Sequence, residues 1–151
     1  RKLEGEESRV YSIGKEVYLR DAHCATCHQP DGQGLAKIYP PLTQREWLAD
    51  DERLIKIALK GLWGPIDVAG QRYDPSQGVP PMMGFGEILG DNELADVLSY
   101  VRQSFGNDLD PVSAEKVRQV RAATKDQINF FTAEELLKAH PLPPPATPPQ
   151  P

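Results

Sequence analysis

Two cysteines stand three positions apart near the start of the chain, and a histidine follows the second one directly: Cys24-Ala25-Thr26-Cys27-His28. This C-x-x-C-H spacing is the pattern for covalent attachment of a c-type haem. Two thiols three apart at a helix end can reach the two vinyl groups on one haem edge. The adjacent imidazole is then held over the iron as its proximal ligand. We therefore predict that Cys24 and Cys27 bind one haem c and that His28 ligates its iron.

Three other interpretations use the same cysteines. A thioredoxin-like redox motif expects a βαβ pattern around the pair, whereas an amphipathic helix is predicted before Cys24. A zinc site needs about four nitrogen or sulfur ligands, and the chain offers beyond the motif only His23, which we expect at the surface or at a helix end, and the distant His140. A simple disulfide leaves His28 without a role. Haem attachment is the favoured hypothesis, and a haem-free thiol–disulfide protein stays open as an alternative.

Charge and hydropathy exclude two classes of protein. The chain has 22 acidic and 17 basic residues and a net charge of −5, which argues against a nucleic-acid binder. No apolar run approaches the roughly 18 residues of a membrane-spanning helix. The chain begins at Arg1, without an initiator Met or an apolar leader, so we expect either a processed protein or part of a longer one.

Apolar residues repeat with helical spacing in three segments, which predicts helices over 10–23, 51–60 and 91–105. An acidic cluster, Asp50-Asp51-Glu52, is interpreted as the N-terminus of the second helix. Between the second and third helices, residues 61–90 are rich in Gly and Pro without clear periodicity. This composition predicts an irregular loop that wraps around something.

Composition divides the chain into four parts. We expect residues 1–9 to be loose, 10–106 to form the haem domain, 107–140 to form a docked helical extension, and 141–151 to be a Pro-rich tail. In the extension, 112–123 can be a helix, and Thr132 with Glu135 forms a capping-box pair. The tail holds 7 of the 15 prolines and cannot bury a core.

A second axial ligand is expected downstream of His28, and the only two methionines of the chain, Met82 and Met83, lie there. Most methionines fill cores. These two lie in a Gly/Pro-rich loop rather than on an amphipathic face, which favours ligation for one of them.

At this point the chain resembles the class I (mono-haem) cytochrome c family over 10–106. The residues that carry the resemblance follow the family's order: Gly14 and Tyr18 in the first helix, C-x-x-C-H, Pro40 and Leu42, then Met82, Phe85, Leu89 and Asp91, and finally Val97 and Tyr100. The resemblance implies an all-α fold of three or more helices wrapped around a covalently bound haem. It also implies that the first and last helices cross near Gly14.

The resemblance implies a set of site residues as well. Met82 keeps the family's register and is the expected iron ligand, while Met83 stands where a Pro usually follows and is the alternative. The carbonyl of Pro40 is expected to accept the Nδ1 proton of His28, which raises the basicity of the ring. Four further side chains are candidates to contact haem edges or propionates: Trp47, Trp63, Arg72 and Tyr73.

With His28 and a methionine on iron, no coordination position is open, which predicts an electron carrier rather than an enzyme. The alternative is a weak or open sixth position that acts in ligand sensing or peroxidase-like chemistry. The expected partners are redox proteins, and the chain is either a free carrier or the cytochrome domain of a larger dehydrogenase or reductase. Haem attachment in this family implies a periplasmic or otherwise extracytoplasmic location.

Overall fold

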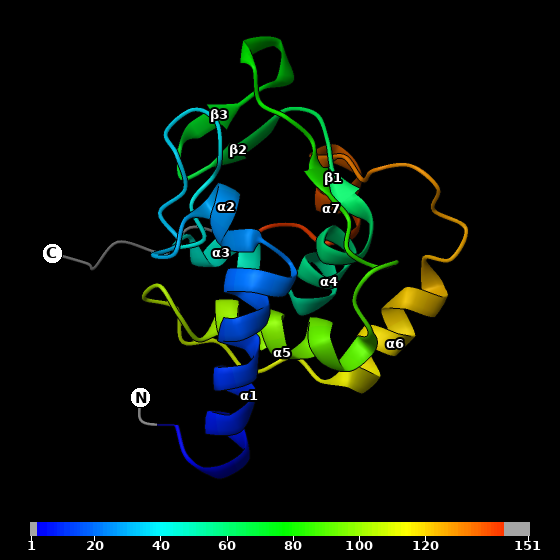
Figure 1. Cartoon of the computed structure of the whole chain (residues 1–151). Coiled ribbons are helices and arrows are strands. Elements are labelled where there is room, and N and C mark those ends of the chain that lie inside the picture. The colour runs from blue at the N-terminus through cyan, green and yellow to red at the C-terminus, as the bar shows by residue number, and fades with distance from the viewer. Residues whose placement is uncertain (1–2, 144–151) are drawn as a thin grey trace, which may run out of the picture.

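A glycine allows the first and last helices of the predicted haem domain to cross at close range. In the computed structural model, which describes residues 3–143, helix α1 (Gly5–Glu16) packs across α5 (Asp91–Arg102) (Figure 1). A Cβ atom on Gly14 would lie 2.1 Å from the carbonyl oxygen of Asp96 and 2.8 Å from the Cβ of Tyr100. Only glycine fits there, and the crossing predicted at Gly14 is confirmed.

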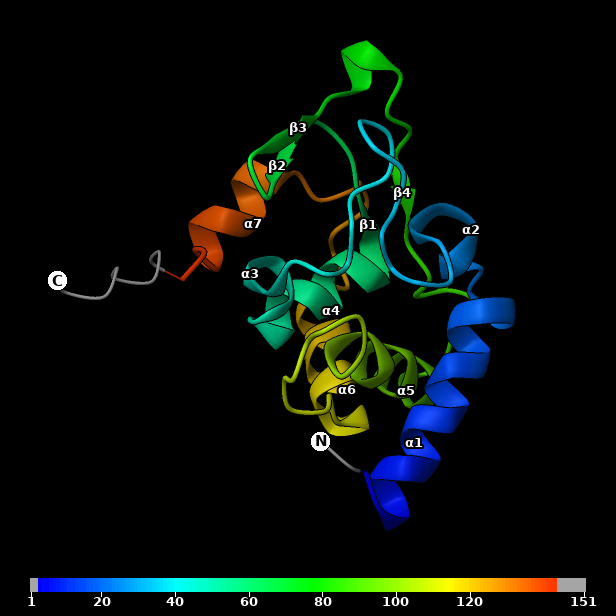
Figure 2. The same cartoon turned by 90° about the vertical axis from the view of Figure 1, so that its left-hand side faces the viewer.

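The remaining helices follow in chain order: a π-helical turn (Val17–Asp21) that continues α1, then α2 (Cys24–His28), α3 (Arg45–Leu48), α4 (Asp51–Lys60), α6 (Ala114–Ala123) and α7 (Ala133–Ala139). Short strands form two antiparallel pairs, β1 (Gly61–Leu62) with β4 (Met82–Met83) and β2 (Ile66–Val68) with β3 (Gln71–Tyr73). A 3₁₀ turn, Pro75–Gln77, lies between β3 and β4. Helices α1, α5 and α6 lie at one end of the molecule and the β2–β3 hairpin at the other (Figures 1 and 2).

Two apolar clusters form the interior. The larger cluster lies among α1, α4, α5 and α6, and its most deeply buried members are Tyr18, Ile55, Leu94, Val117 and Val120. The second cluster joins α3, α4 and the strands to the chain around α7: Trp47, Ile57, Leu62, Ile66, Val68, Tyr73, Phe131, Ala133 and Leu136. The segment after residue 106 therefore supplies buried residues to both clusters.

Side-chain caps begin three of these helices. The Asp50 carboxylate accepts from the backbone N–H of Arg53 at 2.9 Å, and Ser113 accepts from Lys116 at 3.1 Å. Thr132 and Glu135 form the predicted capping box at α7. The acidic cluster at 50–52 is thus confirmed as the start of a helix, as is the helical nature of the extension.

The structure corrects several predicted boundaries. Helix α1 begins at Gly5, so 5–9 are helical instead of loose. Helix α5 ends at Arg102, because Phe105 and Gly106 adopt left-handed backbone angles. Residues 61–90 contain the short strands instead of an irregular loop, since backbone pairing, not periodicity, organises them.

The predicted loose segment and tail lie partly outside the described residues, at 1–2 and 144–151. Within the tail, the carbonyl of Pro141 is held by Arg53. The seven α-helices found within 3–143 confirm the all-α prediction. In that range no helix is long and apolar enough to cross a membrane.

Candidate functional site

Helix α2 places both thiols of the motif on a single turn. Cys24 and Cys27 are free, half-buried and three residues apart, which puts them on the same face of the helix. Non-glycine residues in left-handed or related conformations bracket the turn: His23 (φ 54°) before it and Gln29 (φ 69°) after it. His23 is exposed at this helix end, as predicted. The five-residue length of α2 follows from these two breaks.

The His28 ring is oriented by a single backbone acceptor. Its Nδ1 lies 2.9 Å from the carbonyl oxygen of Pro40, so Nδ1 carries the proton and donates it. This leaves the lone pair of Nε2 free for a metal. Burial lowers the pKa of His28, which favours the neutral imidazole that binds metals. The hydrogen bond predicted between His28 and Pro40 is confirmed.

The two thiols have different surroundings. Burial raises the pKa of the Cys24 thiol to about 11, and the nearby charge of Cys27 adds to the shift. The charge of Cys27, together with burial, raises the pKa of the nearby Tyr39. Cys24 is therefore a protonated thiol at neutral pH. No sequence pattern pointed to Tyr39, because its place near Cys27 depends on how the loop after α2 folds back.

Tyr18 ties the end of α2 to the helix crossing. Its side chain is fully buried, and its hydroxyl donates to the carbonyl of Gln29 at 2.6 Å. Burial also raises the pKa of Tyr18. The ring packs against Tyr100 and Phe105, with centroids 5.4 and 5.5 Å away. The family resemblance singled out Tyr18 in the first helix, but no pattern pointed to its hydroxyl bond.

The two methionines lie on the strand β4 and differ in exposure. Met82 pairs with Leu62 of β1, is half-buried and packs on the second cluster. Met83 is 61% exposed. Successive side chains of a strand point to opposite faces, so one methionine faces the interior and the other faces solvent.

The other candidate contacts are distributed over the second cluster and its rim. Tyr73 is buried, and so is Trp47, whose Nε1 donates to the carbonyl of Asp67 at 3.0 Å. Trp63 follows β1 and is 49% exposed. Arg72 is exposed on the β2–β3 hairpin and pairs with Asp67 at 3.1 Å. The structure thus brings Tyr73 and Trp47 into the cluster on which Met82 packs, and leaves Trp63 and Arg72 on the surface.

The donor set matches the chemistry of a haem c site. Two thiols share one helical turn, a neutral imidazole presents Nε2, and an uncharged thioether is half-buried. Imidazole and thioether are the axial ligands of a cytochrome c iron, and paired thiols provide the covalent link. The residues present fit the group.

Comparisons with known proteins identify the family of the chain. A family model described as cytochrome c matches residues 11–105. Cytochrome c-552 of Thermus thermophilus is 38% identical over 119 residues, which cover 72% of this chain and 84% of that protein.

Two dehydrogenase subunits are also similar. The cytochrome c subunit of a quinone alcohol dehydrogenase from Gluconobacter oxydans is 35% identical over 114 residues, and the cytochrome subunit of fructose dehydrogenase from Gluconobacter japonicus is 34% identical over 113 residues. The matches cover 73% and 71% of this chain but 22% of each of those proteins. The chain therefore belongs to the cytochrome c family, whose members carry electrons on a covalently bound haem c.

Proposed function

We propose that this protein is an electron carrier with one haem c, attached through Cys24 and Cys27 and ligated by His28 and Met82. The observation that carries the proposal is the bond from His28 Nδ1 to the Pro40 carbonyl, 2.9 Å long and adjacent to two free thiols. A neutral imidazole fixed in this way presents the lone pair of its other nitrogen, which is the form of histidine that binds a metal. The exposure of Met83 supports Met82 as the second ligand.

The residues of the chain set how the group works. The haem supplies a one-electron ferric–ferrous couple when bound. His28 is held in one tautomer by Pro40, which strengthens its donation to the metal. A thioether from Met82 favours the reduced state and raises the potential. With His28 and Met82 as its two protein ligands, the group would exchange electrons with partners without binding a substrate.

The partner that we propose is a dehydrogenase or reductase, either in the same polypeptide or in a complex. The similarity to cytochrome subunits of alcohol and fructose dehydrogenases supports this class of partner. Trp63 and Tyr73 are proposed to line the haem, as the family resemblance implies. We also propose an extracytoplasmic location, where haem attachment in this family takes place.

Absorption spectra of the purified protein test this proposal. We expect haem that resists acid–acetone extraction, one haem per chain by the pyridine haemochrome assay, and a ferrous form that does not bind CO readily. Haem that extracts freely, or its absence, would contradict attachment by the two thiols. Rapid CO binding would support an open sixth position, and with it ligand sensing or peroxidase-like chemistry.

A further inference from the structure

The loop that carries Met82 is fastened by parts of the chain beyond the family match, which ends at residue 105. We call residues 82–91, from the first residue of β4 to the start of α5, the methionine loop. Its two halves are held by different parts of the extension 107–140. The second half contacts α6, and the first half pairs with β1, which the residues just before α7 back from the other side.

Arg121 of α6 binds the second half of the methionine loop with its whole guanidinium fork. Nε lies 2.8 Å from a carboxylate oxygen of Asp91, Nη2 donates to the carbonyl of Leu89 at 2.9 Å, and Nη1 donates to the carbonyl of Gly86. The side chain is 34% exposed, so its three bonds are partly shielded from water. A rigid fork with three acceptors in one loop fixes the loop against α6.

Phe130 and Phe131 back the first half of the loop through β1. Phe131 donates its N–H to the Gly61 carbonyl at 3.2 Å and accepts from the N–H of Trp63 at 3.0 Å. Gly61 is enclosed on two sides, because a Cβ there would lie 2.3 Å from the Met82 carbonyl oxygen and 2.7 Å from the Phe130 ring. Strand β1 therefore lies between β4 and the extension, so the extension supports Met82 through β1.

A buried arginine anchors the end of the extension. Arg53 is fully buried, lies over the Trp47 ring at 5.1 Å and donates to the carbonyls of His140 (2.6 Å) and Pro141 (3.4 Å). Removing one partner of such a buried charged bond is costly. The extension is thus attached at α6, at residues 130–131 and at its far end.

We propose that the extension is a positioning element for the methionine ligand, with Arg121 and Phe131 as its positioning residues. The inference rests on the proposed His28/Met82 ligation. Release of a loop-borne ligand requires the loop to open locally, and the frequency of opening depends on the contacts that hold the loop shut. Within residues 3–143, the hydrogen bonds of the Arg121 side chain all go to residues 86–91 of the methionine loop. They therefore control how often Met82 leaves the iron.

The test compares two arginines of the same helix in the haem-loaded protein. Arg121→Gln removes the fork, whereas Arg118→Gln removes an exposed arginine that pairs with Glu115 within α6. The probe is cyanide, and the readouts are its association rate with the ferric protein and the far-red sulfur-to-iron band. We expect the rate of cyanide association to rise about tenfold or more in Arg121→Gln. Arg118→Gln should leave the rate unchanged.

Each outcome has a distinct meaning. Equal cyanide rates for Arg121→Gln and Arg118→Gln, with the band retained, overturn the inference while leaving the proposed function intact. A wild-type protein without the band overturns the proposed ligation itself. If Arg121→Gln does not fold, Arg121→Lys, which keeps the charge but not the fork, should bind cyanide at an intermediate rate. A wild-type rate for that variant also overturns the inference.

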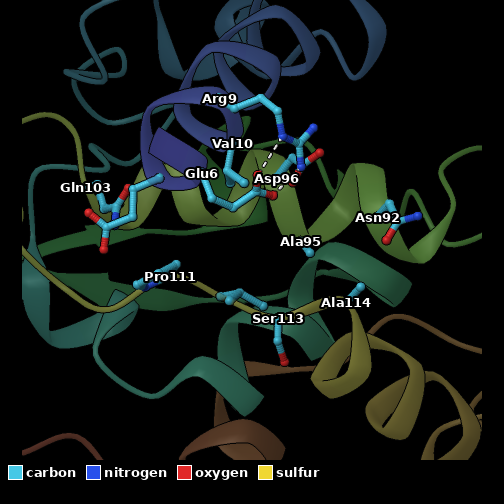
Figure 3. A pocket seen from close by; sticks show the side chains of 12 residues that line it. Glu6, Arg9, Val10, Asn92, Ala95, Asp96, Gln103, Pro111, Ser113 and Ala114 are labelled. Carbon is cyan, nitrogen blue, oxygen red and sulfur yellow. Dashed lines mark hydrogen bonds and ion pairs between the residues drawn. The ribbon is translucent and has the colours of Figure 1, made fainter. Parts of the chain in front are cut away.

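The remaining cavities do not support a proposal of this kind. The groove in Figure 3 lies between α1, α5 and residues 111–114 and is lined by apolar residues such as Val10 and Ala95 together with Glu6, Arg9 and Asp96. Glu6 and Arg9 already pair with each other across one turn of α1.

Discussion

A single side-chain group, the hydroxyl of Tyr18, links the helix crossing to the haem motif. The ring of Tyr18 packs in the buried aromatic cluster, and its hydroxyl donates a hydrogen bond to the carbonyl of Gln29, the residue after His28. Gln29 needs such support because a non-glycine residue with positive φ is strained. The bond therefore holds the C-terminal end of α2 in place.

Tyr18→Phe keeps the ring and removes the hydroxyl. We expect a loss of about 1 kcal/mol in the free energy of unfolding, since the Gln29 carbonyl still accepts from Gly32. Urea denaturation of the haem-loaded protein measures it. Tyr11→Phe is the matched control, because Tyr11 packs in the same cluster but its hydroxyl has no hydrogen bond within 3–143. Equal losses in the two variants would show that the hydroxyl bond to Gln29 does not matter.

Single residues also show what the sequence could predict. The motif and the family resemblance predicted the bond between His28 and Pro40, because both residues have fixed places in the pattern. The burial of Arg53 could not be predicted, because arginine is rarely buried fully and its backbone acceptors come from 46–47 and 140–141. Only tertiary structure brings those carbonyls together.

The close approach of helices α1 and α5 depends on Gly14. Gly14→Ala would place a methyl group against the Asp96 carbonyl and force the helices apart. We expect a loss of about 1–3 kcal/mol in the free energy of unfolding, seen as a lower thermal midpoint. Ser12→Ala, at an exposed site of α1, should stay within about 0.5 kcal/mol. A Gly14→Ala protein as stable as wild type would contradict the crossing.

The N-cap of helix α4, Asp50, makes the free energy of unfolding depend on pH. Burial alone would raise the pKa of Asp50, but the N–H of Arg53 and the charges of His140 and Arg53 lower it below its ordinary value of 3.8. A carboxyl with a lowered folded pKa stabilises the fold fully above the ordinary value. That contribution is lost as pH falls through the folded pKa.

Asp50→Asn keeps a capping oxygen but removes this titration. We expect the thermal midpoint of the variant to fall less steeply with decreasing pH in the acidic range than that of wild type. Thermal melts across that range measure it, with the exposed Asp126→Asn as control. Parallel slopes for wild type and Asp50→Asn would contradict the role of the cap.

Elements differ in how far the sequence determines them. The helices with a strong apolar stripe and caps, such as 91–102, were predicted well because local signals suffice. Strands β1 and β4 have two residues each, too few for any alternation, and they exist because the backbone at Gly61 meets Met82. The left-handed Phe105 ended α5 early because its ring packs over Gly32, a long-range contact.

Charge acts on the whole molecule. The net charge of −5 attracts positively charged partners and is screened by salt. We expect reduction by a small cationic reagent to slow as ionic strength rises and reduction by an anionic reagent to accelerate. Stopped-flow kinetics at increasing NaCl concentration measure both rates. The opposite salt dependence would show that a local basic surface governs electron entry.

The central claim is that His28 and Met82 close both axial positions of one haem. The far-red sulfur-to-iron band of the ferric protein tests it most directly in matched variants. Met82→Ala should lose the band and bind cyanide readily. Met83→Ala should keep the band, because Met83 is 61% exposed on the opposite face of β4. A band that survives Met82→Ala but disappears in Met83→Ala would contradict the assignment.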